Sequence, residues 1–181
     1  MAAIDDFAAL LFDEAKAFLE KAKSASSVEA RTAYLHASLL LGFSSLEAHI
    51  NSIADDFLTL TNLSLLDRSI LSEKEIILED GEYQLTDRLK MFRLEDRMEH
   101  LVKNFSTTPL DKRETYWGEF KAALRLRNEL THPKTPPPTI DISATERALL
   151  AILDVLNMLY KNIYRRPHPS YRLGMDTTMA I

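Results

Sequence analysis

The sequence contains no cysteine and only 4 glycines among 181 residues. The absence of cysteine excludes disulfide bonds, thiolate metal sites and thiol nucleophiles. No run of apolar residues approaches the roughly 18 that a membrane-spanning helix needs. The N-terminus also lacks the basic stretch and apolar block of a secretory signal. We therefore expect a cytoplasmic protein that does not associate with membranes.

Basic residues are also in the minority, with 22 Lys and Arg against 27 Asp and Glu and a net charge of −5. Broad binding to duplex DNA depends on neutralising many phosphates with Lys and Arg side chains. We therefore expect no duplex DNA partner. A local basic pocket is still compatible with this balance of charges.

Most motifs of cofactor and metal chemistry are missing. The chain has no Gly-rich phosphate loop, no Gly-x-Ser-x-Gly and no His-Glu-x-x-His. A di-iron helical bundle needs two Glu-x-x-His pairs and two further carboxylates. The sequence offers one such pair at Glu129 and His132, and a proline follows it. We predict no metal site and no other cofactor.

Hydrophobic residues make up 46% of the chain, and Ala and Leu are plentiful, which favours helices. Apolar spacing predicts six helical segments, four of them with a proposed cap. Asp5 or Asp6, Asp111, and the capping boxes Ser26–Glu29 and Ser143–Glu146 are the predicted caps. The helices are expected at about 5–24, 26–60, 63–71, 94–105, 111–131 and 143–165.

These segments predict an all-α protein, an antiparallel bundle of about five to six helices in one domain over residues 1–165. The pair Asp80-Gly81 lies between short, partly alternating runs and predicts a hairpin-like insertion at 71–86. Residues 166–181 show no periodicity. We expect an irregular tail there, either loose or draped over a partner.

An arginine interrupts the apolar stripe of the helix after Asp111. The stripe runs through Tyr116, Phe120 and Leu124, and its next position is Arg127. A guanidinium there is costly unless it is paired or faces a cavity or an interface. Pro133 ends the helix and releases His132, which then can turn toward the side of Arg127. Alternatively, Arg127 forms a structural salt bridge, and His132 interacts with the helix dipole.

The long helix predicted at 26–60 carries a small and polar stripe beside its apolar one. Glu47 and Asn51 lie four residues apart and face the same way, and Ser44 and Ala48 are small neighbours. Another helix can approach such a stripe closely. Glu47 is therefore the best-placed acidic partner for Arg127, although solvation alone also explains Glu47 and Asn51.

The stretch "RNELTH", from Arg127 to His132, resembles the Arg-x4-His motif of HEPN (higher eukaryotes and prokaryotes nucleotide-binding) domains. Its position near the end of a bundle helix, before the last helix, fits that family. The segment "SSLEAHIN" looks like the corresponding earlier helix of many bacterial HEPN proteins. The resemblance covers roughly residues 26–165, apart from the hairpin-like insertion.

The resemblance implies a helical bundle that dimerises and brings two Arg-x4-His motifs into one cleft. Many HEPN domains are metal-independent endoribonucleases of toxin–antitoxin or phage-defence systems, with an antitoxin or another protein as partner. By this resemblance, Arg127 holds the scissile phosphate and His132 is the general acid or base. Asn128 orients one of them, and Glu47, together with Asn51, supports the arginine.

This chemistry needs no metal because RNA carries its own nucleophile, the 2′-OH. A histidine can move a proton near neutral pH, and an arginine can neutralise an oxyanion. Lys121, Arg125 and Lys134 are candidate phosphate contacts, although each also fits a solvated helix face. The alternative function is a non-catalytic HEPN module that binds a nucleotide or a protein and serves as a dimerisation domain.

Overall fold

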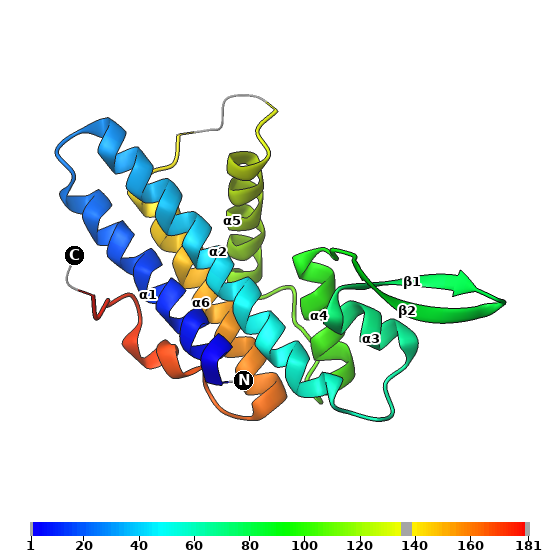
Figure 1. Cartoon of the computed structure of the whole chain (residues 1–181). Coiled ribbons are helices and arrows are strands. Elements are labelled where there is room, and N and C mark those ends of the chain that lie inside the picture. The colour runs from blue at the N-terminus through cyan, green and yellow to red at the C-terminus, as the bar shows by residue number, and fades with distance from the viewer. Residues whose placement is uncertain (1, 135–138, 180–181) are drawn as a thin grey trace.

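The computed structural model describes residues 2–134 and 139–179. Within these ranges the chain forms six α-helices and one antiparallel pair of strands (Figure 1), which confirms the predicted all-α bundle with a small hairpin. The helices are α1 (Ala2–Ser24), α2 (Val28–Leu58), α3 (Leu65–Ser72), α4 (Leu94–Phe105), α5 (Thr115–Thr131) and α6 (Ile142–Tyr164). None of them combines the length and the hydrophobicity that crossing a membrane requires.

The core of the bundle lies between α1, α2 and α6, which run alongside one another in Figure 1. Leu39, Phe43 and Leu46 of α2 and Leu149 and Ile152 of α6 are fully buried there. At Gly42 of α2, an added Cβ would lie 2.5 Å from Cδ2 of Leu149 on α6. A larger residue at this position would therefore force the Leu149 side chain to shift.

The observed N-cap of α2 lies one residue after the predicted one, and the observed N-cap of α6 lies two residues before the predicted one. The cap of α2 is Ser27, whose Oγ accepts a 3.1 Å hydrogen bond from the Ala30 N–H, and the predicted box Ser26–Glu29 is wrong by one residue. The cap of α6 is Asp141, which accepts from the Ala144 N–H at 2.7 Å, in place of the predicted Ser143–Glu146 box. Ser and Asp side chains are both good N-caps, and several lie close together at each of these helix starts. The local backbone conformation therefore determines which of them caps the helix.

The capping predictions for α1 and α5 are also wrong. The first helix begins at Ala2, so Asp5 lies in its first turn. Asp111 does not cap α5, because its carboxylate binds Arg113. The N-cap of α5 is Glu114, which makes no side-chain capping bond. Both misassignments shift a boundary by only about one turn and leave the apolar stripe on the same helix.

The predicted hairpin is confirmed as strands β1 (Lys74–Glu79) and β2 (Glu82–Leu89). Asp80 and Gly81 form its turn with φ values of 51° and 83°, the positive pair that an Asp-Gly turn favours. It lies three residues further along the chain than the predicted 71–86, because α3 includes Leu71 and Ser72. In Figure 1 the hairpin projects away from the helices.

The segment after Arg165 is partly regular and packs on this chain's own bundle. It contains the 3-10 helix η1 (Pro169–Leu173), and the His168 N–H donates to Asn157 of α6 at 3.2 Å. Further along, the Thr178 Oγ1 donates to Asp13 of α1 at 2.6 Å. These contacts tie the C-terminal segment across α6 and α1.

Candidate functional site

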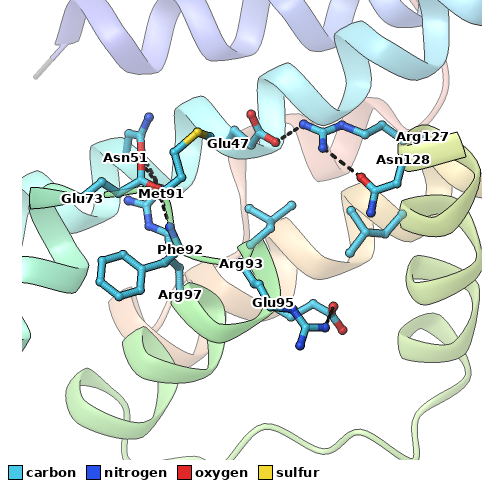
Figure 2. A pocket seen from close by; sticks show the side chains of 12 residues that line it. Glu47, Asn51, Glu73, Met91, Phe92, Arg93, Glu95, Arg97, Arg127 and Asn128 are labelled. Atoms are coloured by element: carbon cyan, nitrogen blue, oxygen red, sulfur yellow. Dashed lines mark hydrogen bonds and ion pairs between the residues drawn. The ribbon is translucent and has the colours of Figure 1, made fainter. Parts of the chain in front are cut away.

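A pocket of about 250 Å³ lies between α2, α4, α5 and the loop that follows β2 (Figure 2). We call it the α5 pocket. Among the residues that line it, the charged ones are three arginines and three glutamates: Arg93, Arg97, Arg127, Glu47, Glu73 and Glu95. Positive and negative groups are therefore balanced, so the pocket is not a simple site for anions.

Arg127 reaches the pocket from the last turns of α5. Its Nη2 forms an ion pair with Oε1 of Glu47, and its Nη1 donates a 3.1 Å hydrogen bond to Oδ1 of Asn128. The guanidinium carbon also lies 5.8 Å from the centre of the Phe43 ring. The predicted pairing of Arg127 with Glu47 is confirmed. The arginine side chain is nevertheless 24% exposed, so a ligand in the pocket can reach it.

Asn51 binds Arg97, and the prediction that it supports Arg127 is wrong. Its Oδ1 accepts a 2.8 Å hydrogen bond from Nη1 of Arg97, which also lies 3.0 Å from Oε2 of Glu73. A second donor of Arg97 lies 3.5 Å from the Leu71 carbonyl oxygen. Burial lowers the pKa of Arg97, while the charges of Glu73 and Glu47 oppose that shift. Arg97 is thus buried, and both of its terminal nitrogens have polar partners.

His132 caps the C-terminus of α5 and is exposed to solvent. Its backbone N–H still donates to the Asn128 carbonyl at 2.9 Å, although its φ of −131° and ψ of 59° are no longer helical. Five steps of about 100° turn His132 well away from Arg127 around the helix. Consequently His132 does not line the α5 pocket, and its imidazole makes no hydrogen bond or ion pair with any described residue.

The three candidate phosphate contacts differ in their surroundings. Lys121 forms an ion pair with Glu95, a carboxylate of the pocket wall. Arg125 and Lys134 are exposed and, over residues 2–134 and 139–179, form no ion pair. Their charges are therefore available to a polyanion, whereas that of Lys121 is already neutralised. No group of three or more His, Asp or Glu residues suited to a metal ion occurs in the part of the chain that the structure describes.

Arg97, with its partner Glu73, is the main feature of the pocket that sequence reasoning missed. The stripe of α4 contains Leu94, Met98 and Leu101, and Arg97 occupies the position between the first two. It lies beside Met98 on the edge of a stripe that runs without a break, whereas Arg127 occupies a stripe position in α5. The apolar pattern of α4 therefore gives no signal that would single out Arg97.

A separate polar cluster lies buried between α2, α6 and η1. The rings of His49 and His168 meet edge to face with centroids 4.7 Å apart, and Tyr160 packs against His168 at 4.6 Å. Burial lowers the pKa of His49 to about 4 and that of His168 to about 3. Both histidines are thus neutral at physiological pH, and their ring contacts join α2 and α6 to the C-terminal segment.

No family model matches the chain, and the searches of curated proteins and of solved structures found no match either.

Proposed function

We propose that the protein is a metal-independent endoribonuclease of the HEPN type that works as a homodimer. The observation that supports this most is the environment of Arg127. Its guanidinium stands in an apolar stripe, is oriented by Glu47 and Asn128, and is still 24% exposed toward the α5 pocket. Because its side chain is already held in place, Arg127 can bind a phosphate without first losing conformational freedom.

In the proposed reaction, the 2′-oxygen of RNA attacks the adjacent phosphorus and loses its proton. The bond from phosphorus to the 5′-oxygen breaks, and that oxygen takes up a proton as it leaves. The products are a 2′,3′-cyclic phosphate and a 5′-hydroxyl end. Arg127 neutralises the negative charge that develops on the phosphate oxygens, and His132 transfers one of the two protons.

The dimer is part of the proposal because a single chain keeps the two groups apart. Arg127 lines the pocket, whereas His132 is exposed on another side of the same helix end. Two copies that meet at the C-terminal ends of their α5 helices would bring the exposed His132 of each within reach of a phosphate. Arg125 and Lys134, which are exposed near this end, would add contacts to the RNA backbone.

The second candidate function is a non-catalytic HEPN module that binds a nucleotide or a protein. One observation favours it: the two terminal nitrogens of Arg127 already have partners in Glu47 and Asn128. In this case Arg127 and His132 would be structural groups at a dimer interface, and RNA would bind without being cut.

The test is incubation of the protein with structured RNA in EDTA. We expect cleavage with 2′,3′-cyclic phosphate ends, and no cleavage of the same RNA when the nucleotide before the cut carries a 2′-deoxy sugar. Cleavage that requires added Mg²⁺, or that proceeds on the 2′-deoxy substrate, would contradict the proposed chemistry. Saturable RNA binding without any cleavage would favour the binding module.

A further inference from the structure

Residues 166–173, which include η1 and which we call the latch segment, are held on α6 mainly by His168. Within this described segment, His168 is the only buried residue, with 2% of its surface exposed. Its backbone N–H donates to Oδ1 of Asn157 on α6 at 3.2 Å. Its ring lies edge to face against Tyr160 of α6 and His49 of α2, with ring centres 4.6 and 4.7 Å away. Detaching the segment therefore requires that this one ring leaves the bundle.

The hydrogen bonds of the His168 ring determine which nitrogen carries its proton. Nδ1 accepts a 3.3 Å hydrogen bond from the Ser170 N–H, and this bond caps η1. A ring nitrogen that accepts carries no proton, so the proton of the neutral ring is on Nε2. Nε2 is buried and has no hydrogen-bond partner among the described residues. The site thus accommodates the neutral ring in one tautomer.

A second proton on His168 would break the cap of η1. It would have to bind Nδ1, where it would remove the acceptor of the Ser170 N–H and place a new N–H against it. The resulting cation would be buried without an acceptor for either ring N–H, which is costly. In agreement with this geometry, burial lowers the pKa of His168 to about 3, with a further contribution from His49.

The carboxylates around the latch segment do not offset this cost, because each is directed at another group. Asp5 of α1 lies 3.9 Å from Nδ1 of His49, Asp56 of α2 accepts from the Tyr164 hydroxyl, and Asp154 of α6 raises the pKa of Tyr171. Asp5 therefore favours a proton on His49 and leaves His168 as the uncompensated histidine of the pair.

The other neighbours of His168 bring positive charge or none. Arg166, two residues before it, lies over the Tyr164 ring at 5.8 Å. Burial raises the pKa of Tyr160 to about 12 and that of Tyr164 even further, so both hydroxyls are uncharged in neutral and acidic solution. A proton on His168 would therefore lie near a cation and without an anion.

We propose that His168 is an acid-sensitive latch, and that residues 166–173 detach from α6 in mildly acidic solution while the bundle stays folded. In the detached segment the imidazole is solvated and can take up the proton that the closed site disfavours. Beyond the segment, the Thr178 hydroxyl still donates to Asp13 of α1, so the segment opens as a loop fixed at both ends. Opening exposes Tyr160 and Asn157, which are 6% and 5% exposed in the closed form. The inference does not depend on RNA cleavage.

The direction of the pH dependence follows from the proton affinities of the two forms. The pKa of His168 is about 3 in the closed form and close to the ordinary value of about 6.5 in the open form. The open form therefore binds the proton first, and its population rises as the pH falls below 6.5. Each pH unit should raise the opening equilibrium constant up to about tenfold, which amounts to about 100-fold between pH 7.5 and 4.5. Exposure of His49 on opening can only add to this rise, because its pKa is lowered as well.

Amide hydrogen exchange of the full-length protein, resolved by NMR between pH 7.5 and 4.5, tests the proposal. The amides to follow are those of His168 and Tyr171, which donate to Asn157 and to the His168 carbonyl. After correction for the intrinsic rate at each pH, their opening equilibrium constant should rise at least about 100-fold. It should also exceed that of buried α2 amides such as Leu39 and Phe43. Latch amides that exchange only together with the α2 amides overturn the proposal, because the segment then opens only when the bundle unfolds.

The variant His168→Asn tests whether this histidine is the titrating group. Its amide oxygen can still accept from the Ser170 N–H, but the side chain does not titrate. The rise in opening should be about 100-fold smaller than in wild type. His36→Asn, at a half-buried histidine of α2, is the matched control and should show the wild-type rise. A His168→Asn protein with the pH dependence of wild type overturns the proposal.

A second variant keeps the proposal testable if His168→Asn opens the segment at every pH. His49→Phe retains His168 and an aromatic ring against it, so the opening equilibrium constant should still rise about 100-fold on acidification. Loss of the pH dependence in His49→Phe would make His49 the titrating group and overturn the role of His168. Circular dichroism checks that each variant is folded.

Discussion

Two groups of polar side chains differ in their access to solvent. Arg97, His49 and His168 are sealed in the interior, each 5% exposed or less. Arg127 and His132, at the C-terminal end of α5, face the α5 pocket and the solvent. The sealed groups are held by burial and fixed neighbours, which suits a structural role. Arg127 is oriented by Glu47 and Asn128 yet accessible, and His132 is exposed, which suits a role in binding or chemistry.

The two arginines provide the most direct comparison. Arg97 has Asn51 and Glu73 as partners within 3.0 Å and is buried. The partner of Arg127, Glu47, is 38% exposed, so water screens this ion pair. The same residue type at the same pocket can therefore contribute very differently to stability.

The largest effect on stability should follow from replacing Arg97. Arg97→Met leaves Glu73 and Asn51 without their partner, and we expect a loss of about 3 kcal/mol in the free energy of unfolding. Arg127→Met should cost less than about 1 kcal/mol, because its ion pair is partly solvated. Urea unfolding of both variants measures the difference, and equal losses would contradict the distinction between the two arginines.

The buried histidines should make the fold sensitive to acid. Their pKa values in the folded protein, about 4 for His49 and about 3 for His168, lie below the ordinary value of 6.5. The unfolded chain therefore takes up protons first as the pH falls below 6.5. Above that pH the histidines do not lower the free energy of unfolding. Between pH 6.5 and pH 4, each histidine should lower the free energy of unfolding by up to about 1.4 kcal/mol per pH unit.

Unfolding in urea at a series of pH values between 7 and 4 measures this slope, and His49→Phe is the variant to compare. Phenylalanine keeps an aromatic ring against Tyr160 and His168 but cannot titrate. The free energy of unfolding of this variant should therefore fall with decreasing pH about half as steeply as that of wild type. A variant with the slope of wild type would show that His49 is not a buried neutral group.

The smallest effects concern the exposed cations near the pocket. Each of Arg125→Ala and Lys134→Ala should reduce the salt dependence of single-stranded RNA binding by about 0.7 in the logarithmic slope. Lys121→Ala should change it less, because Glu95 already neutralises Lys121. Binding measured at several salt concentrations tests this order, and a larger change for Lys121 than for Arg125 would reverse it.

Much of the fold follows from local patterns. Apolar spacing predicts the helices, and Asp80-Gly81 predicts the hairpin, because both signals depend on residues close in sequence. The choice among neighbouring caps does not follow, as Ser27 and Asp141 show, since the backbone selects one of several suitable side chains.

The pocket was predictable only in part. The interrupted stripe of α5 led from Arg127 to Glu47, because a charge in such a stripe needs a partner. The pairing of Asn51 with Arg97 depends on how α2 and α4 pack against each other. The residue pattern within one helix does not predict that packing. The direction of His132 depends on where α5 ends, and Pro133 alone does not fix it.

The most direct test of the central claim compares single-turnover RNA cleavage in EDTA by wild type, Arg127→Ala and His132→Ala. We expect each substitution to lower the rate at least about 100-fold. The free energy of unfolding of each variant should stay within about 1 kcal/mol of wild type, since both side chains are accessible to solvent. A His132→Ala variant that cuts RNA as fast as wild type would contradict the account.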